Sequence, residues 1–463
     1  MVRLNAMNSD AKRGLVVAFA RACRCGLRAG FARLLAAAAL ANFAGPPAVA
    51  NDGALVVSPR RIDDVLSIQA DVDAFPALDN FAWRAFVALN WPSLSDAAHR
   101  GKPDLGKTLG DSGLRVWETF KSRYELFQVG PDGGPAESPP WATYDAANPC
   151  GAVTDTAAKT LASFVPFKDF NQFGLNGMTN PLVAQNRTYT RYETRINEAQ
   201  YSALAFSGWS RGHNLPDKEN PARLPTGSIA VKVAWRLLTA ADSPAVRARY
   251  YVVRNANVVD VARTVAARRV VCSKGDVALV GMHIVIRTTH RPQGVWSTFE
   301  HVDNVPPAGK GKAKEPDARD AGAPYSYFDP ARPKLGLWSK YGATGTLPVS
   351  IDRPPEVRPA PMQVVRRYPI HPSTMVTNRS YWALPGIKGT VWEHYMLVAN
   401  QWPSHSQPVD AYNDGVYFPE SRKENLVNTT LETYQQTPNS SCMSCHRVFN
   451  AMGHDFVAML SFR

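Results

Sequence analysis

The clearest pattern of alternating apolar and polar residues lies in the middle of the chain. Apolar side chains occupy every second position from Ile229 to Leu237, and the residues between them are alanine or basic. A period of two is typical of a β-strand with one buried face. Runs rich in β-branched and aromatic residues predict further strands at 249–254, 268–272, 277–288, 294–302, 363–368 and 391–399.

Helical periodicity is confined to short segments. Apolar residues three and four positions apart predict a helix at 76–90, which ends before Trp91-Pro92, and a second short helix at 115–127. The 36 prolines of the chain argue against long helices. We therefore expect an α+β fold, in which a largely antiparallel β core is flanked by short helices and followed by a short C-terminal helical segment.

The first 50 residues have the composition of an export signal. Their basic residues outnumber the single acidic residue, Asp10, and an apolar run from Leu34 to Phe43 precedes small residues that end at Ala50. This run is shorter than the roughly 20 apolar residues that span a bilayer. We therefore predict a cleavable secretory signal at 1–50, a periplasmic location, and no transmembrane segment in the mature chain.

The rest of the chain is expected to form two parts. Residues 51–425 are predicted to form a β-rich body, and residues 426–463 a C-terminal segment docked on it. Within the body, residues from about 306 to 333 are rich in Pro, Gly, Ala and Lys, which predicts a flexible surface insertion. The basic residues are scattered rather than grouped with aromatic residues, which argues against nucleic acid as a partner.

Four cysteines lie beyond the predicted signal. Cys150 and Cys272 could form a structural disulfide in an oxidising compartment, or remain two buried thiols, and the sequence leaves both possibilities open. The other two belong to the motif Cys442-Met443-Ser444-Cys445-His446. In C-x-x-C-H, two thiols on one face of a helical turn can form thioethers with haem, and the adjacent histidine can ligate the iron.

Two other readings of this motif are weaker. A thioredoxin-like dithiol would need a surrounding βαβ pattern, and a zinc site would need a second pair of ligands; the sequence contains neither. We therefore predict one covalent haem c, attached through Cys442 and Cys445, with His446 as an axial ligand of its iron.

The second axial ligand is not evident from the motif. Only 17 residues follow His446, so we expect the distal side of the haem to be supplied by the body or left open. The candidates are His301, His283 and Met375, followed by His371 and His394. His283 lies in an apolar strand, where a hydrogen-bonded core histidine is the simpler explanation, and His301 precedes a predicted turn at Asp303-Asn304-Val305-Pro306. On a strand, His301 and Glu300 would face opposite ways.

A serine between two glycines suggests a further, hydrolytic chemistry. Gly208-Trp209-Ser210-Arg211-Gly212 fits the nucleophile motif G-x-S-x-G, which needs a strand before the serine and a helix after it. Tyr201 to Phe206 could form that strand, but the prolines that follow make a poor helix start. We predict a surface turn here.

Several segments together resemble a known family. FVALNWP at 86–92, VWETFKSR at 116–123, WSTFEHVDNVP at 296–306 and NTTLETYQQ…CMSCH at 428–446 are similar to large, secreted monohaem c-type cytochromes of bacteria. The resemblance runs over most of the mature chain and implies a bacterial periplasmic haem protein. It marks 296–306 as a family element without giving it a role.

Two functions follow from these features. The leading hypothesis is single-electron transfer between periplasmic donor and acceptor proteins. The alternative is a haem enzyme or sensor with an open distal site that acts on peroxide, oxygen or another small ligand. In that case His301 with Glu300, or Arg366-Arg367, would supply acid–base or charge-stabilising groups. A single C-x-x-C-H argues against a two-haem peroxidase.

Overall fold

The chain divides into two compact units, Met1–Asn51 and Asp52–Arg463. The computed structural model describes residues 55, 57–59, 75–94, 96–144, 147–151, 159–172, 181–217, 219–289, 291–308, 324–332, 349–402, 427–436, 440–455, 457 and 459. The predicted export signal falls in the first unit and lies outside these residues. Every helix in the described part is too short or too polar to cross a lipid bilayer.

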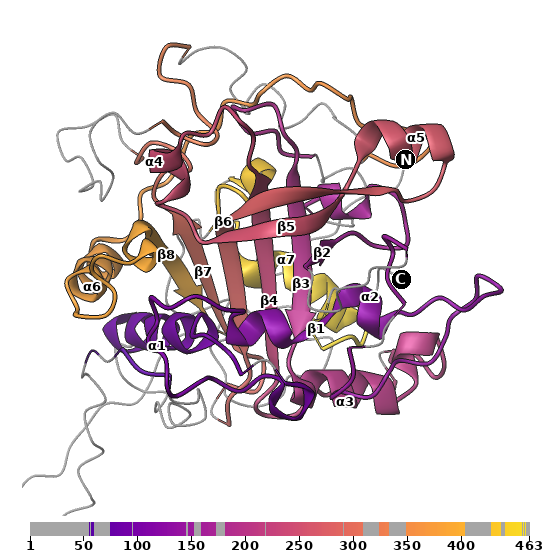
Figure 1. Ribbon diagram of the computed structural model, residues 1–463. Coiled ribbons are helices and arrows are strands. Elements are labelled where there is room, and N and C mark those ends of the chain that lie inside the picture. The colour runs from indigo at the N-terminus through magenta and orange to yellow at the C-terminus, as the bar shows by residue number, and fades with distance from the viewer. Residues whose placement is uncertain are drawn as a thin grey trace, which may run out of the picture. The chain divides into compact units, whose positions relative to one another are not determined.

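An eight-stranded sheet forms the centre of the second unit (Figure 1). The strand order is β1-β3-β4-β6-β5-β2, and β7 pairs with β6 and with β8. All pairings between these strands are antiparallel except β2 with β5. The predicted mixed fold with a largely antiparallel sheet is therefore confirmed. The bounds are β1 Lys121–Ser122, β2 Thr160–Leu161, β3 Thr190–Ile196, β4 Ile229–Leu237, β5 Val252–Val259, β6 Cys272–Ile286, β7 Val295–His301 and β8 Tyr395–Gln401.

The helices are short, as the proline content predicted. The α-helices are α1 Phe75–Leu89, α2 Arg123–Leu126, α3 Glu198–Phe206, α4 Pro244–Arg247, α5 Val261–Ala267, α6 Pro372–Trp382 and α7 Cys442–Ala451. The 3₁₀ turns are η2 Ala97–His99, η3 Val116–Thr119, η4 Lys168–Phe170, η5 Trp209–Arg211, η7 Val391–His394 and η8 Thr433–Gln435. Helix α1 matches the prediction at 76–90 to within one residue at each end.

Helices α1 and α6 help to seal one face of the sheet (Figure 1). Phe86 of α1 stacks on Phe299 of β7 with ring centroids 4.3 Å apart, and Trp83 stacks on Tyr381 of α6 at 4.8 Å. All four rings are buried and belong to the largest hydrophobic cluster. Burial of aromatic surface on this scale is the main driving force for folding of the unit.

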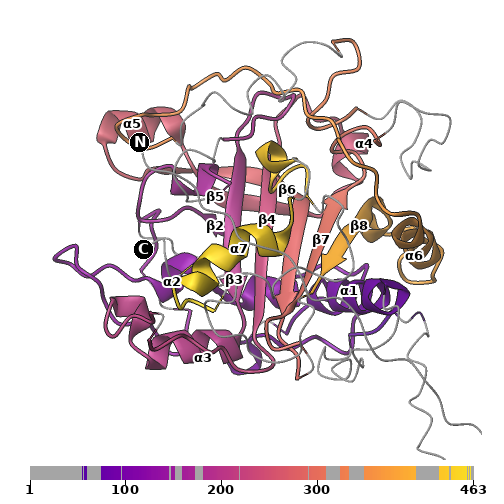
Figure 2. The same cartoon turned by 180° about the vertical axis from the view of Figure 1, so that it is seen from behind.

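The opposite face is covered by the C-terminal part of the chain, and Figure 2 shows α7 lying across the strands there. Before α7, residues 427–436 form a buried turn that contacts the sheet. Gly281 of β6 permits this close approach, because a Cβ at that position would lie 2.2 Å from Thr430 Oγ1. Asn428 ties the turn to β7 by donating its side-chain N–H to the carbonyl oxygen of Phe299, at 2.8 Å.

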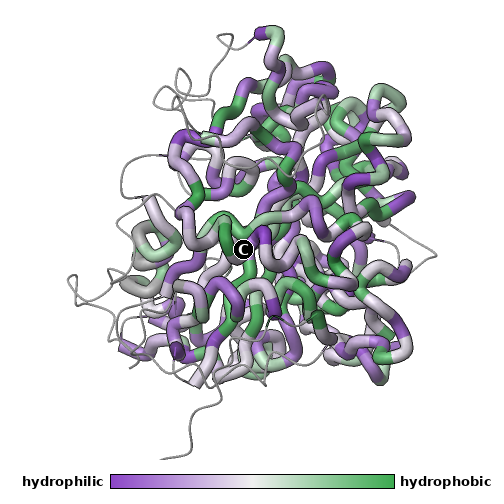
Figure 3. Tube along the Cα trace, turned by 90° about the vertical axis from the view of Figure 1, so that its left-hand side faces the viewer, coloured by the Kyte–Doolittle hydropathy of each residue, from purple (hydrophilic) through white to green (hydrophobic). Residues whose placement is uncertain are grey.

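The period-two pattern predicted β4 correctly. Figure 3 shows that hydrophilic and hydrophobic residues alternate at short intervals along much of the described chain. Three other segments differ from their prediction. Residues 115–127 do not form one helix, because Lys121 and Ser122 pair with β3 and interrupt it. Of 268–272, only the last residue belongs to a strand. Residues 363–368 form no strand; Gln363 makes an isolated β-bridge, and the Val364 N–H donates to the carbonyl oxygen of Tyr327 at 2.8 Å.

The prediction of a flexible insertion at about 306–333 is wrong for its later part. Tyr327 is fully buried, and its hydroxyl lies 2.8 Å from Thr190 Oγ1 on β3. The sequence composition concealed this anchor, because the surrounding residues are those of a loop. Residues 309–323 lie outside the described residues.

Cys150 and Cys272 form a disulfide, which settles the choice that the sequence left open. Their Cα atoms lie 5.3 Å apart although 122 residues separate them along the chain. The bond fixes the segment before β2 to the start of β6. Closing a loop of this length stabilises the fold by about 5 kcal/mol in the chain-entropy description.

Candidate functional site

Helix α7 carries the whole C-x-x-C-H motif. Cys442 and Cys445 form no disulfide and are half-buried. Because they lie three positions apart on a helix, their side chains share one helix face. His446 follows directly and is also half-buried. Local helical structure is therefore enough to bring the three predicted attachment residues together.

The sheet beside α7 is incompletely covered. On β4 and β6, alternate residues are half-exposed, whereas the residues between them are buried against the opposite face. We call the half-exposed set the open strip; it consists of Ala230, Lys232, His283 and Val285. Antiparallel sheets commonly have one solvated face, so the strip marks a partly solvent-exposed part of this face.

Trp296 of β7 pairs with Val285 and lies on the same face of the sheet as the open strip. The ring of His446 lies against its indole, with centroids 4.5 Å apart and planes inclined by 56°. Met443 is buried in the same small cluster. The Met443 N–H donates to Gln401 Oε1 at 2.7 Å, which ties the start of α7 to β8. The motif is thus held to the sheet by both apolar packing and a hydrogen bond.

Charged side chains surround the open strip. His283 Nε2 lies 2.9 Å from Glu432 Oε1. The second oxygen of Glu432 accepts the Asn428 N–H at 2.9 Å, so the turn at 427–436 positions the carboxylate. Lys232, which faces His283 across the β4–β6 register, donates to the carbonyl oxygen of Gln172 at 2.6 Å.

Burial is the main influence on the pKa of Cys442 and of Lys232. Burial, with smaller contributions from Glu432 and Cys445, raises the pKa of Cys442 well above its ordinary value. Burial lowers the pKa of Lys232, and Glu432 and Cys445 partly offset this effect. The Cys442 thiol is therefore neutral at physiological pH. Among the described residues, no group of three His, Cys, Asp or Glu side chains is arranged to hold a metal ion by itself.

His301 and Glu300 do not belong to the open strip, and they contact different residues. The His301 ring is fully buried, stacks on Tyr250 at 3.8 Å, and has the Arg249 carbonyl oxygen 3.0 Å from Nε2. Its Nδ1 accepts the Asp303 N–H. Burial lowers the pKa of His301 to about 3. The predicted turn after His301 is present, and the ring is occupied on both nitrogens.

Glu300 faces the other way, as the alternation along a strand predicted. It forms a buried ion pair with Arg366 at 2.7 Å and accepts hydrogen bonds from Thr429. Arg367 is likewise engaged, because its side chain donates to the carbonyl oxygen of Gln436. These groups anchor the 427–436 turn and do not face an open site.

The remaining predicted ligands lie around α6 and β8. Met375 is buried in a separate cluster, where its sulfur accepts a hydrogen bond from the Asn378 side chain at 3.5 Å. His371 begins α6 and has Nδ1 2.7 Å from Ser373 Oγ. His394 lies in η7. Of the distal candidates, only His283 lies on the open strip.

The G-x-S-x-G segment is a turn, as predicted. Residues 198–206 form α3 rather than a strand, and Ser210 lies in η5 with its hydroxyl 3.0 Å from Ser138 Oγ. Neither element required by a nucleophile elbow is present at these positions.

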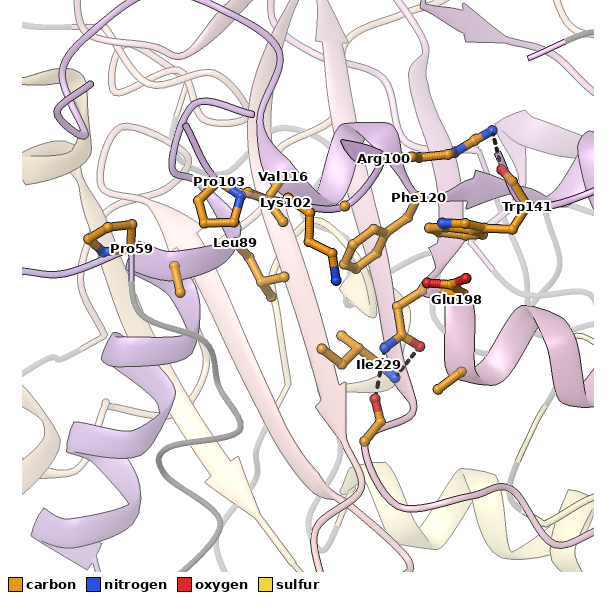
Figure 4. A pocket seen from close by; sticks show the side chains of 15 residues that line it. Pro59, Leu89, Arg100, Lys102, Pro103, Val116, Phe120, Trp141, Glu198 and Ile229 are labelled. Atoms are coloured by element: carbon orange, nitrogen blue, oxygen red, sulfur yellow. Dashed lines mark hydrogen bonds between the residues drawn. The ribbon is translucent and has the colours of Figure 1, made fainter. Parts of the chain in front are cut away.

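A hollow of about 290 Å³ lies beside the end of α1 and the start of α3 (Figure 4). Trp141 forms part of its wall, and Lys102 and Glu198 contribute charges of opposite sign. Arg100 also lines it, but its guanidinium is bound to Glu125 at 2.9 Å. The hollow could accept a small polar molecule, and it shares no residue with the open strip.

No sequence motif assigns a function to the turn at 427–436. Asn428 is the residue that could have indicated the turn, because its side-chain oxygen accepts the N–H groups of Thr430 and Leu431 at 2.9 and 3.2 Å. Asparagine commonly initiates such turns by this contact. Because Glu432 follows within the same turn, the segment carries a charge to the open strip that no motif indicated.

Two thiols, an imidazole and a partly open sheet surface therefore meet at α7. Comparisons of the chain with protein-family models, with curated proteins and with solved structures give no match.

Proposed function

We propose that the protein is an exported c-type cytochrome that carries one covalent haem on α7 and transfers single electrons between periplasmic proteins. Cys442 and Cys445 would form the two thioethers, and His446 would ligate the iron. The observation that carries the proposal is the position of these three residues on one short helix above the open strip. When bound, haem supplies one-electron iron chemistry, and the chain attaches, ligates and shields it.

The residues around the motif fit a large apolar group with a charged edge. Trp296, Met443 and Val285 offer apolar contacts, while Lys232 offers a cation. A thioether sulfur is uncharged, so it suits a position where burial keeps the Cys442 thiol neutral. The partly exposed strip leaves some of this sheet face accessible beside the motif.

Two competing chemistries fit less well. A redox-active dithiol needs a thiolate with a lowered pKa, whereas the pKa of Cys442 is raised. A structural zinc site needs four ligands around one point, and the described residues offer no cluster of three.

The Cys150–Cys272 disulfide supports the proposed location. Structural disulfides persist in oxidising compartments, and covalent haem attachment is proposed here for the same side of the membrane. The export signal at 1–50 remains a prediction.

Electron transfer is favoured over catalysis because the proposed acid–base groups are not available. His301 and Glu300 are fully buried, and Arg366 is paired with Glu300. A catalytic site would need such groups beside the haem and free to exchange protons. The structure holds them instead as supports for β7 and the 427–436 turn.

The test is expression of the full chain in a bacterial host with cytochrome c maturation machinery. We expect haem that stays with the protein on a denaturing gel, and we expect its loss in the double variant Cys442→Ala/Cys445→Ala. Ser444→Ala is the matched control, because it changes the motif at a position that forms no thioether and should keep the haem. Covalent haem in the Cys442→Ala/Cys445→Ala protein would overturn the proposal.

A further inference from the structure

We infer that His283 is the second axial ligand of the haem iron and that Glu432 positions its imidazole. This inference rests on the proposed function. It gives the large body of the protein a direct part in the redox site, because β6 would supply a ligand that α7 lacks.

Strand register brings His283 within reach of the motif. Val285 of β6 pairs with Trp296 of β7, and the indole of Trp296 contacts His446. His283 lies two residues from Val285 on the same face, a separation of about 6.6 Å along a strand. By the same measure His301 lies five residues beyond Trp296, about 17 Å away.

The His283 ring has two nitrogens, so one can contact Glu432 while the other ligates iron. Its Nε2 lies 2.9 Å from Glu432 Oε1, which leaves Nδ1 as the nitrogen that would ligate the iron. The side chain keeps 18% of its surface exposed, whereas the side chain of His301 is fully buried.

Glu432 has the position expected of a residue that orients a metal-bound histidine. Such histidines commonly donate their second ring N–H to a carboxylate, which fixes the ring and raises its basicity. Glu432 is itself held by the Asn428 N–H, and the turn that carries it needs Gly281 in order to approach β6. A residue used only for surface charge would not need this support.

The other histidines of the described strands and of α6 are engaged elsewhere. The strands contain only His283 and His301, and both nitrogens of His301 are occupied in the sealed core. His371 contacts Ser373 at the start of α6. Met375 accepts a hydrogen bond from Asn378 in a separate cluster.

The experiment compares the full-length haem-loaded protein with His283→Ala, using His371→Ala as the matched control. We expect the wild-type and control proteins to give low-spin spectra that carbon monoxide does not change. His283→Ala should keep its covalent haem, become high-spin by electron paramagnetic resonance, and bind carbon monoxide. Added imidazole should restore the low-spin spectrum, which a merely structural effect would not produce.

Two more variants keep the test decisive if His283→Ala folds poorly. His283→Met should remain low-spin with a more positive midpoint potential, because thioether ligation raises the potential. Glu432→Gln should retain the low-spin state and shift the potential upward, because the imidazole loses its carboxylate partner.

The outcomes separate the two proposals. Wild-type protein without covalent haem would overturn the proposed function itself. Covalent haem that stays low-spin in His283→Ala, or with an unchanged potential in His283→Met, would overturn only the assignment of His283. A wild-type protein that is high-spin and binds carbon monoxide would also overturn that assignment, and would favour the ligand-binding alternative.

Discussion

The two faces of the central sheet differ in how deeply their side chains are buried, although the same strands contribute to both. On the α1 face, Met282, Ile284 and Phe299 are fully buried among stacked aromatic rings. On the α7 face, His283 and Val285 alternate with those residues and remain half-exposed. The buried α1 face stabilises the fold, whereas the α7 face leaves polar side chains partly exposed on the side of the sheet where the two thiols lie.

The two strand histidines illustrate this difference. His301 is fully buried and hydrogen-bonded on both nitrogens, and burial lowers its pKa to about 3. His283 is partly open and has one carboxylate neighbour. Residue type alone does not distinguish a ligand from a structural histidine; the covering of the strand does.

The largest expected effect comes from removing an aromatic ring on the sealed face. Phe299→Ala should lower the free energy of unfolding by about 3–5 kcal/mol, because it deletes the ring between Phe86 and Trp83 and leaves a cavity. Val285→Ala, on the open strip, should cost only about 1 kcal/mol, because its side chain is already half-exposed. Chemical denaturation of both variants measures the difference. Equal losses would contradict the contrast between the faces.

The second effect concerns the anchor of the 427–436 turn. Glu300→Gln should cost about 3 kcal/mol, because Arg366 would keep a buried charge without its partner. The exposed pair Arg268–Asp352 provides the control, and Asp352→Asn should cost less than about 1 kcal/mol. Denaturation at neutral pH tests both. A negligible loss in Glu300→Gln would show that the turn is held by other contacts.

How much of this could be predicted from the sequence depends on the range of the interactions. Residues 76–90 and 229–237 carry their periodicity within one segment, and both elements formed as expected. Residues 363–368 have strand-like composition, yet the Val364 N–H donates to the Tyr327 carbonyl oxygen in a loop, and Tyr327 itself lies in a loop-like segment yet packs on β3. These outcomes depend on partners more than 30 residues away, which local patterns do not contain.

The same distinction holds for the candidate site. Cys442, Cys445 and His446 are adjacent in sequence, so a motif could identify them. Glu432 and His283 are about 150 residues apart, and only the strand register and the 427–436 turn bring them together. The sequence therefore placed His283 among several candidates, and the fold distinguished it from His301.

A third prediction tests the close approach of that turn. Gly281→Ala should lower the free energy of unfolding by about 1–3 kcal/mol, because the added Cβ would collide with Thr430 Oγ1 and press on Asn428. Thr430→Ala removes the atom that collides. The double variant should therefore be less destabilised than the sum of the single variants, by at least about 0.5 kcal/mol. Strict additivity in denaturation experiments would show that the turn does not press on β6.

The last prediction is a pH dependence that arises from His301. Burial lowers its pKa from 6.5 to about 3; Asp303 and the hydrogen bond to the Arg249 carbonyl oxygen oppose this shift, and the charges of His394 and Arg249 add to it. Between these values the unfolded chain binds a proton that the folded chain does not, so acidification favours unfolding. The stabilising contribution is complete above pH 6.5 and is lost as the pH falls toward 3, by at most about 1.4 kcal/mol per pH unit.

Urea denaturation at a series of pH values below 6.5 measures this slope. His301→Gln replaces the titrating ring with a neutral amide, so its stability should fall less steeply over the same range, whatever its stability at neutral pH. His99→Gln is the control, because His99 is exposed and its ring lies beside Asp96 at the surface. If His301→Gln keeps the wild-type slope, the acid sensitivity arises elsewhere. Burial on the α1 face would then not be what makes the fold sensitive to acid.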